Sequence, residues 1–160
     1  MMLTRGQRKA QGQAAEERFR AWLDRCHLPH IYVEQSPFTF PRHLKDEIKR
    51  PDFLVGIPSI GTIAVDVKAK QVYRDTILID AREHNTLLAF ETFFNISVWF
   101  ASFPPDEPHT CYLFLNRSLA GIATTRAQGK DVLAVALTLT RPADERRDFM
   151  AALMAALSRR

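Results

Sequence analysis

Two aspartates and one lysine, Asp52, Asp66 and Lys68, have the side-chain types and the spacing that chemistry on a phosphate would need. Asp52 comes directly before an apolar run, and Asp66 and Lys68 lie two residues apart in the next one. Two carboxylates that converge can hold a divalent metal, which prefers oxygen ligands, and an ammonium group beside them can meet a phosphate. The three side chains therefore predict metal-assisted cleavage of a phosphodiester bond.

The two aspartates can converge only if the segments that carry them pair with each other. Residues 52–57 are apolar after the first, and residues 58–61 have the composition of a turn. Residues 62–70 then alternate between apolar and charged side chains, as a strand with two different faces does. This pattern predicts an antiparallel hairpin in which Asp52 lies opposite the far end of the second strand, near Asp66.

An exposed sheet face would show the same alternation, because oppositely charged side chains commonly pair across strands. A functional site is favoured because Asp is depleted in strands, yet both predicted strands carry one. Glu16 adds a further acid, one turn after Gly12 and beside the apolar stripe of a predicted helix. Taken alone, Glu16 is more simply a solvated acid paired with Arg20.

The periodicity of the apolar residues predicts the elements that must position these side chains. They are a helix over about 12–26, a short strand at 31–33, a mostly irregular stretch at 36–50, a helix from a capping box at Asp80 and Glu83 to about Phe94, strands at 96–103, 111–115 and 132–140, and a C-terminal helix at 143–157. Residues 117–130 fit no single element. The order indicates an α/β protein with a mixed central sheet flanked by helices.

Composition and charge are those of a globular chain of 160 residues. Residues 1–50 hold ten Lys and Arg against six Asp and Glu, whereas the remainder holds twelve of each. Such a basic excess can contact nucleic acid, although a solvated basic arm is the simpler interpretation of charge alone. No apolar stretch reaches the roughly 20 residues of a membrane span, and the N-terminus lacks the apolar segment of a signal peptide. We therefore expect a cytoplasmic protein with no membrane partner.

Pro51-Asp52, Asp66-Val67-Lys68 and the upstream Gly12-x-x-x-Glu16 resemble the motifs of the PD-(D/E)xK nuclease superfamily. That superfamily includes Holliday-junction resolvases, many restriction endonucleases and phage exonucleases. The resemblance implies a restriction-endonuclease-like core of helix, three strands, helix and strand (αβββαβ) over about residues 12–103. Additional strands and a helix would follow in a C-terminal extension of about 104–160, within a single domain of residues 1–160.

The resemblance also implies roles for individual residues. Asp52 and Asp66 would hold Mg²⁺ or Mn²⁺, and the backbone carbonyl of Val67 would add a ligand. Glu16 would join the metal shell through water. Lys68 would orient the attacking water or stabilise charge on the phosphate, which suits a cation placed where negative charge develops.

The expected function is that of a metal-dependent DNA endonuclease, with DNA as the partner and a homodimer as the form in which many members of the superfamily act. Lys70 could contact the DNA strand or simply balance the carboxylates. The full set of candidate nucleic-acid contacts is Lys70, Gln71, Lys49, Arg50, Arg8 and Lys9. Two alternatives stay open. One is a catalytically inactive nuclease-fold protein that serves as a nucleic-acid-binding or assembly module, and the other is an unrelated α/β interaction domain.

Overall fold

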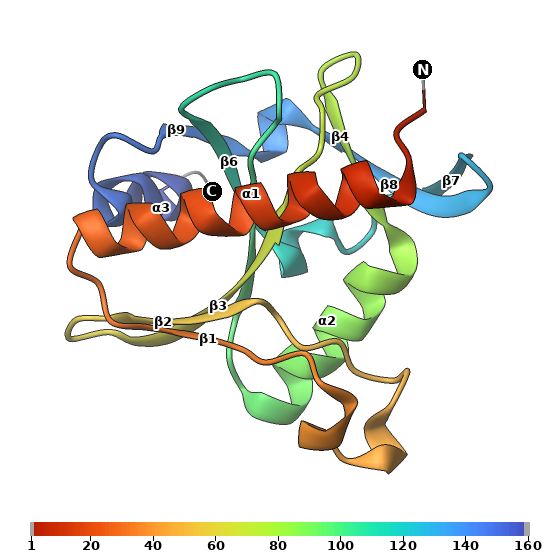
Figure 1. The fold of residues 1–160 in the computed structure, drawn as a ribbon, viewed down its shortest axis with the longest axis horizontal. Coiled ribbons are helices and arrows are strands. Elements are labelled where there is room, and N and C mark those ends of the chain that lie inside the picture. The colour runs from red at the N-terminus through yellow and green to blue at the C-terminus, as the bar shows by residue number, and fades with distance from the viewer. Residues whose placement is uncertain (1, 159–160) are drawn as a thin grey trace.

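A mixed sheet of six strands lies at the centre of the structure, a computed structural model that describes residues 2–158 (Figure 1). The helices are α1 (Arg5–Arg25), α2 (Ala81–Phe94) and α3 (Phe149–Leu157). The strands are β1 (His30–Tyr32), β2 (Phe53–Ile57), β3 (Gly61–Lys68), β4 (Thr76–Asp80), β5 (Val98–Ser102), β6 (Thr110–Leu115), β7 (Thr124–Ala127), β8 (Lys130–Ala136) and β9 (Arg141–Asp144). The central sheet has the order β1-β2-β3-β5-β6-β9, and a smaller sheet has the order β4-β8-β7.

The predicted succession of helix, three strands, helix and strand is confirmed for the central sheet, while an additional strand of the smaller sheet, β4, comes before the second helix. β2 and β3 form the expected antiparallel hairpin, and β3 is then the parallel neighbour of β5. A parallel pair needs a long crossover because the chain must return to the end of the sheet at which the first strand began. Here the crossover runs through β4 and α2, and it brings the first turn of α2 to the end of β3, where Glu83 contacts Lys68.

α1 and α3 pack on one face of the central sheet. Phe19 and Trp22 of α1 and Phe149 of α3 are almost completely buried there. The ring of Phe19 meets that of Phe53 edge-on with centroids 5.2 Å apart, an arrangement favoured by the charge distribution of aromatic rings. The indole nitrogen of Trp22 donates a hydrogen bond of 2.7 Å to the carbonyl of Arg147. These contacts hold α1 across the β2–β3 hairpin.

α2 and the smaller sheet pack on the opposite face. Leu87 of α2, Ile79 of β4 and Phe100 of β5 are buried together in a second core. Side chains alternate along a strand, so Val65 joins the first core while Ala64 joins the second. The even-numbered positions that follow Ala64 in β3 therefore face α2.

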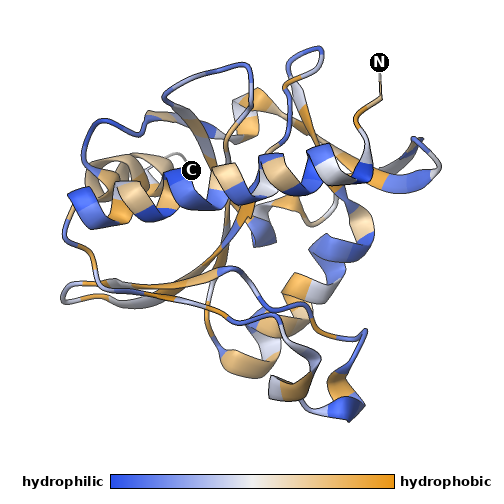
Figure 2. Cartoon of the chain, viewed as in Figure 1, coloured by the Kyte–Doolittle hydropathy of each residue, from blue (hydrophilic) through white to orange (hydrophobic). Residues whose placement is uncertain are grey.

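α1 begins at Arg5, two turns before the predicted start near residue 12. Its first turn carries a capping box, in which the Thr4 side chain accepts from the Gln7 amide at 3.2 Å and the Gln7 side chain accepts from the Thr4 amide at 2.8 Å. The apolar stripe that guided the prediction starts only at Ala15. Figure 2 shows hydrophilic and hydrophobic sectors alternating along α1.

The C-terminal part of the chain differs most from the prediction. The expected helix at 143–157 begins only at Phe149, capped by Asp148, and residues 141–144 form the edge strand β9. The strand expected at 132–140 ends at Ala136, and β4 was not predicted. β6 and β9 extend the central sheet, whereas β8 pairs with β4. None of the helices within residues 2–158 is long and apolar enough to cross a membrane.

Candidate active site

The register of the β2–β3 hairpin places Asp52 opposite Asp66. Phe53 pairs with Val65, and the Asp52 amide donates to the Val65 carbonyl at 3.1 Å. The Asp52 side chain continues the pairing beyond the end of β2, because its Oδ2 accepts a hydrogen bond of 2.7 Å from the Val67 amide. This bond fixes the Asp52 carboxylate against the backbone of β3, one residue from Asp66.

Asp66 is completely buried and is held between two ammonium groups. Lys49 Nζ lies 2.8 Å from its Oδ1 and 3.0 Å from its Oδ2. Lys68 Nζ lies 2.7 Å from its Oδ2. An ionised carboxylate can be buried in this way only when it is paired, because removing an isolated charge from water is costly.

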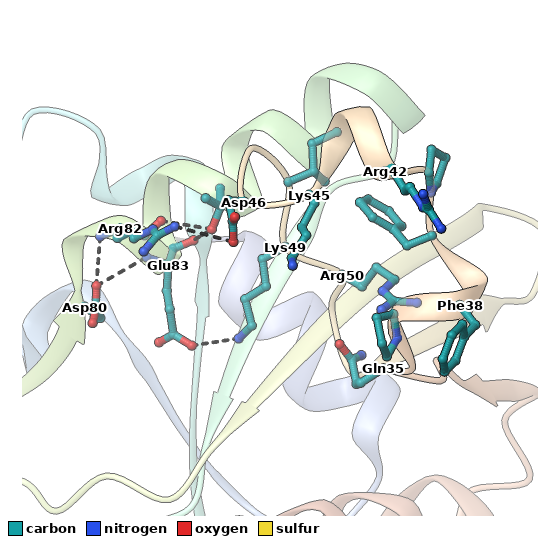
Figure 3. A pocket seen from close by; sticks show the side chains of 15 residues that line it. Gln35, Phe38, Arg42, Lys45, Asp46, Lys49, Arg50, Asp80, Arg82 and Glu83 are labelled. Carbon is teal, nitrogen blue, oxygen red and sulfur yellow. Dashed lines mark hydrogen bonds and ion pairs between the residues drawn. The ribbon is translucent and has the colours of Figure 1, made fainter.

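Glu83, in the first turn of α2, was missed as a site residue. Together with Asp52, Asp66, Lys49 and Lys68 it forms the charge cluster of this site. Its Oε1 lies 2.8 Å from Nζ of both Lys49 and Lys68, and Figure 3 shows it reaching Lys49. The predicted capping box is therefore only half correct. Asp80 does cap the helix, since its Oδ1 accepts from the Arg82 amide at 2.9 Å and the Glu83 amide at 3.4 Å, but the Glu83 carboxylate turns to the lysines.

The charged groups in this cluster shift one another's pKa values. Burial and then repulsion from Asp66 raise the pKa of Asp52 to about 7, against the opposing effects of Lys49 and the Val67 amide. Burial also favours neutral Glu83, but Lys68 and Lys49 outweigh it and lower the pKa of Glu83 to about 2. Burial favours neutral Lys68, yet Asp66 and Glu83 outweigh it and raise the pKa of Lys68. The two carboxylates therefore favour the ammonium form of Lys68.

The oxygen atoms around Asp52 suit a hard divalent cation. Within residues 2–158, no group of three or more His, Cys, Asp or Glu side chains is placed to hold a metal ion. Mg²⁺ does not need one, because it is usually held by one or two carboxylates together with waters and substrate phosphates. The Val67 amide donates to Asp52, and a strand residue directs its amide and carbonyl to the same side, so the Val67 carbonyl is on the same side of β3 as Asp52.

Glu16 lies outside the charge cluster. It belongs to α1, which covers the face of the sheet opposite to Asp66. Burial raises the pKa of Tyr32 most, and the Glu16 carboxylate raises it further. The same carboxylate contributes to the raised pKa of Asp52, but less than burial or Asp66 does. The structure therefore places Glu16 beside Tyr32 and within electrostatic reach of Asp52, but not among the lysines.

The predicted nucleic-acid contacts near the hairpin have different surroundings. Lys49 belongs to the charge cluster rather than to an open surface. Arg50 is committed to the preceding loop, where it donates to Thr39 Oγ1 at 2.8 Å and to the Ser36 carbonyl at 3.1 Å. Lys70 is half-buried just beyond β3, where burial and then Lys68 lower its pKa.

The other predicted contacts are exposed. Gln71 follows Lys70 in the segment between β3 and β4. Arg8 and Lys9 lie near the start of α1, where the Arg8 guanidinium donates to the Leu3 carbonyl at 3.2 Å. Arg8 is eight residues before Glu16, which is about 12 Å along a helix. In the described part of the chain, none of these three side chains forms an ion pair with the charge cluster.

The helix, the hairpin and the crossover through α2 together define a restriction-endonuclease-like fold. Among solved structures, the chain is similar to that of Hjc, a Holliday junction resolvase from the archaeal hyperthermophile Archaeoglobus fulgidus. The TM-score is 0.53 at 16% sequence identity, over 81% of this chain and 86% of the resolvase chain. This likeness confirms the fold class that the resemblance to PD-(D/E)xK nucleases implied. No protein-family model and no curated protein sequence matches the chain.

Proposed function

We propose that this protein is a DNA endonuclease that hydrolyses phosphodiester bonds with the help of Mg²⁺ or Mn²⁺. The observation that carries the proposal is the pairing of Asp52 with Asp66 across the β2–β3 hairpin, with Lys68 beside them, in a fold shared with a Holliday junction resolvase. A sheet face whose charges served only solubility would not need a completely buried aspartate between two lysines. The proposed enzyme would act on DNA and, like many nucleases of this fold class, could do so as a homodimer.

Asp52, Asp66 and the Val67 carbonyl are the groups that would hold the metal. When bound, it would act as a Lewis acid on the phosphate and lower the pKa of a coordinated water. The Asp52 carboxyl must lose its proton before it can serve as a ligand, and its pKa of about 7 makes that loss pH-dependent near neutrality. The Asp66 carboxylate is already held in place by the two lysines.

Lys68 would stabilise negative charge on the phosphate. Because Asp66 and Glu83 keep it protonated, its part in the reaction is electrostatic rather than that of a proton acceptor. Its ammonium group is fixed between two carboxylates 2.7 and 2.8 Å away, so little reorganisation is needed when substrate charge develops. Glu83 is a positioning residue in this scheme, since it acts on the phosphate only through the lysines.

Lys49 would have a second electrostatic part. Its ammonium group now forms ion pairs with Asp66 and Glu83. A divalent cation bound between the aspartates would neutralise part of their negative charge instead. Its ammonium group would then be available to a phosphate oxygen. Lys70, Gln71, Arg8 and Lys9 would contact the DNA backbone farther from the scissile bond, and Glu16 would reach the metal shell through water.

Cleavage of supercoiled plasmid tests this proposal. The wild-type protein is expected to nick or linearise plasmid with Mg²⁺ or Mn²⁺ and not with EDTA, and Asp66→Asn and Lys68→Ala are expected to abolish cleavage. Asp106→Asn, an exposed aspartate outside the cluster, is the matched control and should cleave normally. Branched and single-stranded DNA belong in the same assay, because a structure-selective enzyme would leave plasmid intact. Intact DNA of all three kinds in every metal would contradict the proposal.

A second candidate function is that of a nuclease-fold module that binds nucleic acid without cutting it. The charge balance favours it, because Lys49 and Lys68 already pair with both oxygens of Asp66. In that case DNA affinity would be the same with Mg²⁺ and with EDTA, and Asp66→Asn would change stability rather than activity. The metal dependence of DNA binding separates the two functions.

A further inference from the structure

An exposed aromatic ring stands at the rim of a cavity beside the charge cluster. Phe38 lies on a short 3-10 turn, Pro37–Thr39, and 96% of its surface is open to solvent. The cavity, of about 630 Å³, is formed between the loop before β2 and the start of α2 (Figure 3). This volume is within the range of about 300–1,000 Å³ that holds small organic ligands. Lys49 and Glu83 are among its lining residues, and both are ion-paired within the charge cluster, so the cavity borders the proposed active site.

The turn that carries Phe38 is held in place by contacts of the residues before and after it. Arg50 bonds to Ser36 and Thr39, and its guanidinium lies 4.9 Å from the ring centre of Phe40. The Gln35 side chain donates to the Pro51 carbonyl at 3.3 Å, one residue before Asp52. The loop that carries Phe38 is therefore joined by hydrogen bonds to Arg50 and Pro51, the two residues directly before Asp52.

The end of the same loop is anchored to α2. Ile48 is buried in the second core, and the Lys49 amide donates to the Thr86 carbonyl at 3.2 Å. Among the exposed large hydrophobic side chains of residues 2–158, Phe38 has the largest exposed fraction, and burying such a ring is favourable. Because Phe38 also lines the cavity, its open face is available to a partner that enters there.

The charges around the cavity fit a polyanion. Its lining carries five basic residues against three acidic ones, and one of the three, Glu83, is already paired with lysines. Arg42 and Lys45 are exposed on the loop side. An aromatic face together with a basic groove is the combination by which proteins hold single-stranded nucleic acid, through base stacking and contacts to the phosphates.

We propose that this cavity receives an unpaired nucleotide next to the scissile phosphate. Its base would stack on Phe38, and Arg42 and Lys45 would meet its phosphates. A base inside continuous duplex has both faces covered by its neighbours and cannot reach an isolated ring, whereas an unpaired base can. The placement next to the scissile bond rests on the proposed function, and the inference adds a substrate class to it: DNA with a single-stranded or unpaired segment.

DNA affinity measured in EDTA tests the inference without any dependence on cleavage. Three labelled DNAs of equal length serve as probes, namely a single strand, a continuous duplex and a duplex with a short unpaired bulge. The wild-type protein should bind the single strand and the bulge more tightly than the duplex. Phe38→Ala should weaken these two complexes by roughly 5- to 150-fold, the range for loss of one stacked base, and leave the duplex complex unchanged.

Three further variants and a fluorescent base separate stacking from other effects. Phe38→Trp should retain the affinity for unpaired DNA, and Phe38→Leu should lose most of it. Phe93→Ala removes another exposed ring, at the far end of α2, and should change nothing. A 2-aminopurine at the unpaired position should lose fluorescence on binding to the wild type and regain it with Phe38→Ala.

Equal affinity for all three DNAs, no binding at all, or an unchanged affinity after Phe38→Ala would overturn the inference. Failure of the proposed function looks different, because plasmid, branched and single-stranded DNA would then all survive in Mg²⁺ and in Mn²⁺ while the effect of Phe38 on affinity in EDTA persisted. That second outcome would keep the cavity as a site for an unpaired nucleotide in a binding module.

Discussion

Replacing Asp52 with Asn should stabilise the metal-free protein at alkaline pH while removing metal binding. Burial and the nearby Asp66 raise the pKa of Asp52 from 3.8 to about 7. Between these values the folded protein holds a proton that the unfolded chain has lost, so the contribution of Asp52 to stability falls as the pH rises through this window. The Asn side chain keeps an oxygen that can accept the hydrogen bond from the Val67 amide, but it carries no charge.

The size of the effect follows from the two pKa values. Moving the pKa of a carboxyl from 3.8 to about 7 corresponds to about 4 kcal/mol of destabilisation once the group is ionised. Wild type and Asp52→Asn should therefore have similar free energies of unfolding near pH 4. By pH 8 the variant should be more stable by up to about 4 kcal/mol. Mg²⁺ should then stabilise the wild type and leave the variant unaffected, because only the carboxylate binds it.

Urea unfolding followed by tryptophan fluorescence measures this difference, because Trp22 and Trp99 are both buried. The wild type and Asp52→Asn are compared from pH 4 to pH 8 in EDTA and again in Mg²⁺. Parallel stability curves for the two proteins in EDTA would refute the assignment of a raised pKa to Asp52. A Mg²⁺ effect of equal size in both would show that the metal binds elsewhere.

Three other substitutions probe the site and its supports. Glu83→Gln should lower plasmid cleavage by about tenfold or more and stability by about 1–2 kcal/mol, since both lysines lose a charged acceptor; normal cleavage would remove Glu83 from the site. Gly56→Ala should cost about 1–3 kcal/mol in urea unfolding, because the added Cβ would lie 2.9 Å from Pro29 Cγ, and an unchanged midpoint would mean that Pro29 yields freely. Arg18→Ala should cost about 1–3 kcal/mol, because it removes the guanidinium from the largely buried Glu145 and leaves only the more distant ring of His109, 3.7 Å away; in a double-mutant cycle Glu145→Gln should remove most of that cost, and additivity would contradict a direct pair.

The β2–β3 hairpin could be predicted because its signals are local. Alternation between apolar and charged residues indicates a strand directly, and a short turn at 58–61 leaves little freedom in the register. That register was enough to bring Asp52 opposite Asp66. The same reasoning predicted the sides of β3 correctly, with Val65 and Val67 in one core and Asp66 on the other side.

Glu83 was not identified as a site residue because a local explanation for its position was available. Its spacing from Asp80 fits a capping box, yet its partners Lys68 and Lys49 are 15 and 34 residues away in the chain. Lys49 was likewise assigned to the DNA surface because nothing in the sequence shows that the loop before β2 folds back onto α2. A signal did exist, since an acid in the first turn of a helix that follows the motif is placed to meet the motif lysine.

β4 and β9 were missed for a related reason. β4 has five residues and gains its partner β8 only about 55 positions later, so no local pattern marks it. β9 contains Pro142, which is tolerated because β9 forms the edge of the sheet, and the apolar residues of α3 made the segment resemble the start of that helix. Long-range pairing outweighed the local pattern in both cases.

Binding of Mn²⁺ followed by electron paramagnetic resonance tests the central claim most directly, because it reports the metal site without requiring a substrate. The wild-type protein at pH 8 should remove Mn²⁺ from the free pool in a saturable way, and Mg²⁺ should compete. Asp52→Asn and Asp66→Asn should each abolish this binding, whereas Asp106→Asn should not. Mn²⁺ binding that survives both site substitutions, or that the wild type lacks altogether, would contradict the assignment of this hairpin as a metal-dependent active site.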